Sequence, residues 1–252
     1  MTILVVTGIT KRFGSLVAVN RVDVCLEPGT IHAIIGPNGA GKTTLFNCVT
    51  GLHLHDEGSI LFKGHPLERL KSHERVVLGI SRTFQNVRLF SQMTVLENVM
   101  VGRHCRTRAG LLRMFFRLGS LPEERAIRAR AEEILEFIGL SHRRDAGATT
   151  IPFGEQRRLE IARALSTDPD LLLLDEPTSG MNPRETEEID EVIKKIRALG
   201  KTILLIEHDM SVVMKISDLV TVLNFGVKIA EGPPEMVQKD PRVIEAYLGT
   251  ED

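Results

Sequence analysis

The residues best suited to chemistry are those of the glycine-rich segment that begins at position 36. They form the pattern Gly-x-x-x-x-Gly-Lys-Thr, with an apolar run before it and apolar residues at helical spacing after it, which predicts strand, loop and helix. Glycines allow backbone N–H groups to surround a polyphosphate. Lys42 is placed to reach the β- and γ-phosphates, and the Thr43 hydroxyl is a ligand for Mg²⁺. The alternative to a phosphate-binding loop is an ordinary glycine turn with a solvated lysine. The predicted phosphate-binding residues are Gly36, Pro37, Asn38, Gly39, Ala40, Gly41, Lys42, Thr43 and Thr44.

Two neighbouring carboxylates, Asp175 and Glu176, close the apolar run 171–174. Four leucines before turn signals favour a buried parallel strand, although periodicity alone also allows a helix. Open α/β sheets bind ligands at the carboxyl ends of their strands. Asp175 is therefore predicted to hold the Mg²⁺ that Thr43 also contacts, and Glu176 to orient or deprotonate a water aimed at the γ-phosphate. A solvated loop pair is the alternative.

Composition limits the class of protein. The 252 residues are 42% hydrophobic, enough for one large domain with a substantial core. A formal net charge of −1 argues against a generic nucleic-acid binder. The three cysteines are scattered and suit a reducing compartment, and the eight histidines lack metal spacing. The N-terminal residues do not predict a signal peptide, and no run approaches the roughly 18 apolar residues that span a bilayer. We expect a cytoplasmic protein that is able to dock on a membrane protein.

One segment departs from this balance. Arginines gather between residues 103 and 130, against only Glu123 and Glu124. Such a stretch could face lipid head groups, RNA or an acidic partner, and a solvated helical face is an equally good interpretation. The arginines are at positions 103, 106, 108, 113, 117, 125, 128 and 130.

Periodicity predicts the elements that must position these residues. Alternating apolar residues over 17–26 indicate an antiparallel strand, and a helix over 42–50 should end at Gly51. A capping box, Thr94 with Glu97, and an apolar stripe over 127–138 indicate a helical insert. The later elements are predicted as a helix up to 165, strand 171–174, helix 184–199, strand 202–207 and a hairpin of strands 219–224 and 227–230. We expect a single domain over 1–252, with residues 1–90 and 151–252 as an α/β core with a β subdomain and 91–150 as a helical subdomain.

In this order, the phosphate loop, the helical insert, the helix after Gly154, the Asp-Glu strand and His208 resemble the ATP-binding subunits of ABC transporters. The resemblance covers nearly the whole chain. It implies an α/β fold, a P-loop NTPase core with an antiparallel β subdomain and a helical insert. It implies ATP and Mg²⁺ as cofactors.

The resemblance also implies roles for three further side chains. In the family an aromatic residue before the phosphate loop stacks on adenine, and Phe13 occupies that place, with an ordinary core Phe as the alternative. Gln85, in Thr-Phe-Gln-Asn, matches the glutamine that senses the γ-phosphate and the metal and touches the membrane domain. His208 matches the histidine that contacts the γ-phosphate. Elsewhere, an exposed glutamine and a loop histidine would carry no such meaning.

The signature segment departs from the family pattern Leu-Ser-Gly-Gly-Gln. Residues 151–155 read Ile-Pro-Phe-Gly-Glu, so only Gly154 is identical. In the family this helix N-terminus binds the γ-phosphate held by the other subunit, and Gly154 is therefore expected to act in trans. Backbone N–H groups and the helix dipole survive the change. Pro152 has neither the hydroxyl nor the N–H of the missing serine, which should weaken that clamp.

A narrower similarity lies in residues 153–160, 179–183 and 244–249 and in the arginine-rich insert near 101–103. These segments look like the larger ATPase subunit of branched-chain (hydrophobic) amino acid importers. That resemblance implies an ATPase on the cytoplasmic face of the inner membrane, paired with a second ATPase subunit as a heterodimer or homodimer. It also implies permease subunits and, indirectly, a solute-binding protein, with no nucleic acid. Two alternatives stay open: a non-transport ABC ATPase acting on RNA, ribosome or DNA, and the ATPase of an exporter or lipid-extraction system. The sequence does not identify the solute.

Overall fold

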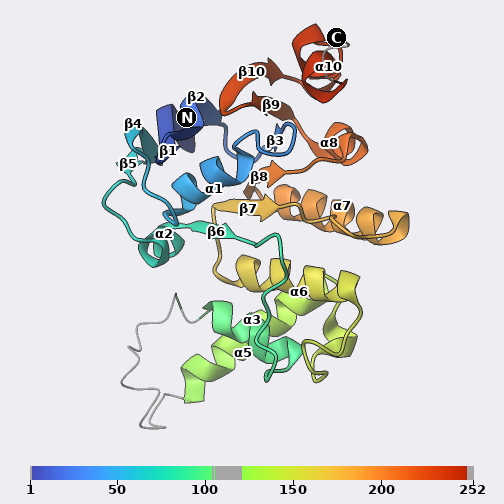
Figure 1. Ribbon diagram of the computed structural model, residues 1–252. Coiled ribbons are helices and arrows are strands. Elements are labelled where there is room, and N and C mark those ends of the chain that lie inside the picture. Colours follow the sequence, from blue (N-terminus) through green and yellow to red (C-terminus); the bar gives the residue numbers. More distant parts are fainter. Residues whose placement is uncertain (1, 104, 106–120, 249–252) are drawn as a thin grey trace.

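The computed structural model describes residues 2–103, 105 and 121–248. Two sheets and a group of helices make up this part of the chain (Figure 1). The smaller sheet is antiparallel, with strand order β2-β1-β4-β5. Its strands are β1 (Leu4–Phe13), β2 (Leu16–Leu26), β4 (Glu57–Phe62) and β5 (His65–Pro66).

The larger sheet carries the candidate site and has the strand order β10-β9-β3-β8-β7-β6. Neighbours from β9 to β6 run parallel, and β10 is antiparallel to β9. Because the parallel strands share one direction, their carboxyl ends meet at one edge, where open α/β sheets bind ligands. The strands are β3 (Ile31–Ile35), β6 (Ile80–Arg82), β7 (Leu171–Asp175), β8 (Thr202–Ile206), β9 (Leu219–Asn224) and β10 (Val227–Gly232).

Helices cover both sheet faces and one end of the molecule. Helices α3, α5 and α6 pack on one another at the end opposite α10 (Figure 1). The helices are α1 (Lys42–Thr50), α2 (Ser72–Leu78), α3 (Val95–Arg103), α5 (Leu121–Phe137), α6 (Phe153–Ser166), α7 (Pro183–Ala198), α8 (Met210–Ile216), α9 (Pro234–Val237) and α10 (Pro241–Leu248), with a 3₁₀ turn η2 at Ser141–Arg143.

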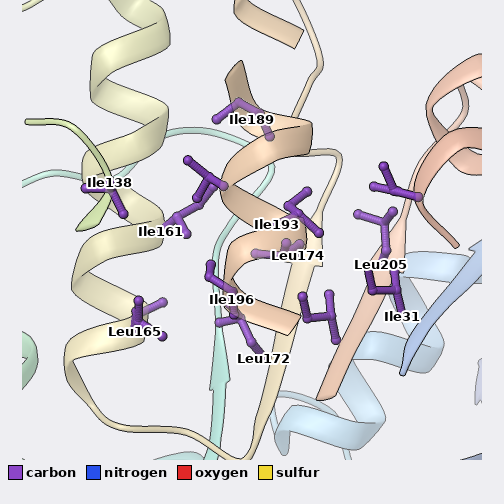
Figure 2. Packing of buried hydrophobic residues seen from close by; sticks show 14 of the residues in the cluster. Ile31, Ile138, Ile161, Leu165, Leu172, Leu174, Ile189, Ile193, Ile196 and Leu205 are labelled. Atoms are coloured by element: carbon purple, nitrogen blue, oxygen red, sulfur yellow. The ribbon is translucent and has the colours of Figure 1, made fainter. Parts of the chain in front are cut away.

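Two clusters of buried apolar residues cover the two faces of the larger sheet. On one face, residues such as Leu172, Leu174 and Leu205 pack against α6 and α7 (Figure 2). On the other face, alternate residues such as Leu171 and Leu173 pack against α1 and the antiparallel sheet. All five residues of β7 are buried, as expected for a parallel strand covered on both sides. Each fully buried Leu contributes about 1.5–3 kcal/mol, so the strand that carries the carboxylates is firmly anchored.

Helix α1 begins and ends where the sequence predicts. It spans Lys42–Thr50, and Gly51 ends it in the left-handed conformation with φ 74°. The buried guanidinium of Arg75, on α2, donates to the carbonyl oxygens of Cys48 and Val49 at 2.7 and 2.8 Å. Those carbonyls lie at the helix end, where intrahelical partners run out. The helix that follows the phosphate loop is therefore fixed at its far end by a buried cation.

The predicted elements of the helical insert are present within the described residues. Thr94 and Glu97 exchange capping hydrogen bonds at the start of α3. The residues of the predicted stripe are buried; Ile127 to Leu135 lie on α5, and Ile138 follows its last residue. Helix α6, assigned to the core by the predicted division, packs against α3 and α5; the division at residues 90 and 150 stays a prediction.

The arginine-rich stretch is described only in part. Arg106, Arg108, Arg113 and Arg117 lie outside the described residues. On α5, Arg128 and Arg130 pair with Glu132 and Glu133 on the exposed face, as a solvated helical surface does. Within the described residues, no helix is both long and apolar enough to cross a membrane.

Candidate nucleotide-binding site

The phosphate loop joins β3 to α1 and is held by close backbone packing. Gly36, Gly39 and Gly41 have φ values of 148°, 80° and 97°, a region that favours glycine. A Cβ at Gly36 would collide with the carbonyl oxygen of Leu223, and one at Gly41 with that of Ala18. The glycines therefore serve both the turn and the approach of neighbouring strands, which fixes the loop before any ligand arrives.

Lys42 folds back over the loop that precedes it. Its Nζ donates to the carbonyl oxygens of Gly36 at 2.7 Å and Pro37 at 3.0 Å, and the side chain is buried. Burial lowers the pKa of Lys42, while the nearby carboxylates of Glu176 and Asp175 act in the opposite direction. The ammonium group therefore lies within electrostatic reach of the carboxylate pair.

Asp175 is the last residue of β7 and is buried. Its Oδ2 lies 2.5 Å from a terminal nitrogen of Arg82, on β6. Its Oδ1 is buried and has no hydrogen-bond partner among the described residues. Burial raises the pKa of Asp175, and the Arg82 guanidinium opposes that shift. A buried carboxylate oxygen without a partner is costly, so this atom is suited to a cation or an ordered water.

Glu176 brings two of the predicted residues together. The Gln85 amide donates to Glu176 Oε2 at 3.0 Å, and His208 Nδ1 lies 3.8 Å from the same oxygen. The Glu176 backbone has φ 47°, and its N–H donates to the carbonyl oxygen of Ile206 at 2.9 Å. A non-glycine residue with φ above zero is uncommon, and such strain gathers at functional sites. The sheet edge thus collects Glu176, Gln85 and His208 from three separate loops.

Phe13 lies at the end of β1 and is 44% exposed, so it is not an ordinary core residue. Its ring meets that of His53 edge to face at 5.3 Å, and Lys11 Nζ lies 5.3 Å from the ring centre. The β1–β2 hairpin also carries Ala18, which contacts Gly41 of the phosphate loop. An exposed aromatic side chain on a hairpin that touches this loop is suited to stacking on a base.

Gly154 is the second residue of α6. A Cβ there would have Glu185 of α7 as its nearest neighbour, 2.8 Å from Oε1. Pro152 is the N-cap and supplies no side-chain hydrogen bond. The helix N-terminus therefore lies beside Glu185, in the first turn of α7.

The sequence patterns did not predict three charged residues that lie at the site. Arg82 holds Asp175, while Arg157 and Glu160, both on α6 and each only 1% exposed, contact the backbone of the loop that carries Gln85. A lone arginine on a three-residue strand has no sequence signal. The spacing of Arg157 and Glu160 was readable as an i,i+3 pair on one helix face, but their burial was not.

Comparison with known proteins adds to this geometry. Residues 19–179 match the ABC transporter family. The chain belongs to the ABC transporter family. It is an ATP-binding subunit whose ATPase activity is coupled to transport, and the resemblance and the fold class expected from its motifs are both confirmed. Residues 227–252 also match a family described as branched-chain amino acid ATP-binding cassette transporter.

Individual relatives agree over nearly the whole length. The chain is 47% identical to the high-affinity branched-chain amino acid transport ATP-binding protein LivG of Escherichia coli K12, over 98% of both chains. The crystal structure of a nucleotide-free ATP-binding cassette from an ABC transporter superposes with a TM-score of 0.87 at 36% identity, covering 99% of this chain and 100% of the other. A dimeric cassette in a post-hydrolysis state, bound to ADP and phosphate, gives a TM-score of 0.78 at 26% identity, with 92% and 98% covered.

Proposed function

We propose that this ABC subunit powers an importer of branched-chain or other hydrophobic amino acids. The observation that carries the proposal is the 47% identity, over 98% of both chains, to a relative named for branched-chain amino acid transport. The match of residues 227–252 to a branched-chain cassette family supports it from a different part of the chain. The subunit would lie on the cytoplasmic face of the membrane against separate permease subunits.

ATP would bind across the loops described above. The phosphate-loop N–H groups and Lys42 would hold the β- and γ-phosphates, and the Phe13 ring would stack on adenine. Glu176 would orient or deprotonate the attacking water, with Gln85 and His208 beside it. The contacts of Gln85 and His208 with Glu176 Oε2 support these roles, because all three must face one small volume.

The residues present fit Mg²⁺. The unpartnered Oδ1 of Asp175 and the exposed hydroxyl of Thr43 are hard oxygen ligands, with Gln85 as a third candidate. Within the described residues, no group of three or more His, Cys, Asp or Glu side chains is arranged to hold a metal. That suits Mg²⁺, which is usually bound by one or two carboxylates together with substrate phosphates and water. The ion would neutralise phosphate charge.

A second ATPase subunit would complete the site. The position of Gly154 at the N-terminus of α6, against Glu185, supports a helix N-terminus that serves the nucleotide of a partner. A dimeric relative bound to ADP and phosphate supports the pairing of two subunits. Closing of the pair around ATP, and its reopening after hydrolysis, would drive the permease through differential binding of ATP to two states. A heterodimer with a shorter relative is our preferred form.

The permease would dock at a groove of about 490 Å³ beside the loop of Gln85. The groove lies between β6, α3 and α6, and the Phe90 ring at its wall is 46% exposed. Arg88 and Arg163 add positive charge. A groove that shares a loop with Gln85 offers a direct mechanical link between docking and the nucleotide site.

Purification from native membranes in mild detergent tests this function. We expect permease subunits and a second ATPase to accompany the chain, and leucine-loaded binding protein to stimulate hydrolysis in proteoliposomes. The same binding protein without solute is the control. Association with ribosomes, RNA or DNA in place of a permease would establish the rival class, and stimulation by lipid alone would favour a lipid-extraction system.

A further inference from the structure

The loop that carries Gln85 is held by two charged side chains of α6. Arg157 donates from one terminal nitrogen to the carbonyl oxygen of Phe84 and from the other to that of Gln85, each at 2.8 Å. Glu160 accepts from the Phe84 N–H at 3.3 Å and pairs with Arg157 at 3.2 Å. The backbone at Phe84 and Gln85 is therefore held by hydrogen bonds at two carbonyls and one N–H.

These backbone contacts are made by a buried ion pair, and taking two charged groups out of water carries a large desolvation cost. Arg157 and Glu160 are each 1% exposed. Burial raises the pKa of Glu160, and Arg157, then the Phe84 N–H, act in the opposite direction. Replacing a buried ion pair by apolar residues is often neutral or stabilising. Fold stability alone is therefore a poor reason for placing an arginine and a glutamate here.

The geometry offers a better reason in the side chain of Gln85. Gln85 is exposed, and its side chain reaches Glu176 Oε2 at 3.0 Å. An exposed glutamine has many rotamers, so its direction depends on where its backbone is fixed. The planar guanidinium of Arg157 has two separated donors, which suits it to fixing two successive carbonyls. The helix that begins beside Gly154 thus also sets the position of Gln85.

We propose that Arg157 and Glu160 are positioning residues for ATP hydrolysis, which fix the backbone of Phe84 and Gln85 so that the Gln85 amide meets Glu176. The proposal rests on the proposed function, in which Gln85 and Glu176 face the reacting phosphate. Their hydrogen bonds reach the main chain of Phe84 and Gln85, so they would act through the backbone. Misplacement of a reacting group by about 1 Å costs on the order of 100-fold in rate.

The test is a double-mutant cycle in the assembled transporter. Arg157→Lys keeps the charge beside Glu160 but cannot place two separated donors on the two carbonyls. We expect kcat for ATP hydrolysis to fall about 10- to 100-fold, with little change in KM. In a Gln85→Ala background the same substitution should cost less than about twofold, because the two changes disrupt one arrangement. The control, Arg158→Lys, lies on the same helix and pairs with Glu188, and it should leave kcat within about twofold.

A second variant guards against a folding defect. Glu160→Gln keeps an oxygen for the Phe84 N–H and removes only the charge, and its kcat loss should likewise vanish in the Gln85→Ala background. If Arg157→Lys lowers kcat by the same factor with and without Gln85, positioning is wrong while the proposed function stands. If Gln85→Ala alone leaves kcat unchanged, the proposed role of Gln85 is wrong, and this inference with it.

Discussion

The edge of the parallel sheet and the N-terminus of α6 differ in how many candidate functional residues each brings together. At the sheet edge, Lys42 and Glu176 share a small volume with Asp175 and Gln85, and every one of them has contacts within the chain. At the α6 N-terminus, a Cβ on Gly154 would meet Glu185, and Pro152 supplies no side-chain cap. The residues proposed to hold the phosphates and the attacking water lie at the sheet edge, and the residue proposed as the second clamp lies at the α6 N-terminus. We infer that this subunit offers one half of a composite site to its own ATP and the other to its partner's.

The largest expected effect is at the sheet edge. Glu176→Gln should lower phosphate release by about 10²- to 10⁴-fold, because it removes a base or water-orienting group. ATP affinity should persist, since Lys42 and Asp175 are untouched, and the ATP-bound dimer should accumulate. Single-turnover hydrolysis and equilibrium ATP binding measure both. Near-wild-type turnover would remove Glu176 from the chemistry and weaken the contrast between the two regions.

Lys42→Ala should act on binding itself. Loss of a charged hydrogen-bond donor costs about 1.5–3 kcal/mol, or roughly 10- to 100-fold in Kd for ATP. Calorimetry on the purified chain measures it. Lys63→Ala, which removes a partly exposed ion pair with Asp170, is the matched control and should leave Kd unchanged. Equal affinities for wild type and Lys42→Ala would contradict the phosphate-loop assignment.

The altered signature should weaken the other region. One missing hydrogen bond to a charged group is worth about 1.5–3 kcal/mol, so the chain alone should dimerise weakly on ATP and hydrolyse it slowly. Pro152→Ser should strengthen both, and a partner with an intact signature should restore activity mainly at the Lys42–Glu176 site. Strong ATPase activity from the isolated wild-type chain would mean that the Gly154 backbone is clamp enough.

Phe13→Ala should have the smallest effect. Stacking on a base is worth about 1–3 kcal/mol and reads a π-face, so ATP affinity should fall while the preference between ATP and GTP hardly changes. Leu199→Ala, at an apolar residue that is 55% exposed after α7, is the control. A large change in base preference, or no loss at all, would exclude stacking by Phe13.

Much of the fold was predictable because long elements carry their own signals. Helix α1 and its glycine stop match the predicted bounds, and α7 begins at Pro183, one residue before the predicted start, with Asn182 as its capping residue. Short elements were not predicted: α2 and α8 have seven residues each, and β6 has three. Such lengths are too short for periodicity, and long-range packing decides their form.

The site shows the same division. Sequence order and spacing were enough to name Lys42, Asp175 and Glu176, because each closes or follows a buried strand. Motifs could not reveal Arg82, since its meaning comes only from the pairing of β6 with β7, which sets it beside Asp175. The sequence did not reveal the roles of Arg157 and Glu160 for a related reason. Charged residues are expected on the protein surface, and the burial of these two depends on how α6 packs against the Gln85 loop.

The measurement that tests the composite site most directly is ATP-dependent dimerisation of the Glu176→Gln chain with and without Gly154→Asp. The added carboxylate would lie beside Glu185 at the helix N-terminus. Calorimetry should give the same ATP affinity for both chains as monomers, because Lys42 and Phe13 are intact. Analytical ultracentrifugation should detect the ATP-bound dimer only for the chain that keeps Gly154. If Gly154→Asp abolishes ATP binding by the monomer while its melting temperature is unchanged, Gly154 acts within its own chain and the shared-site account is wrong.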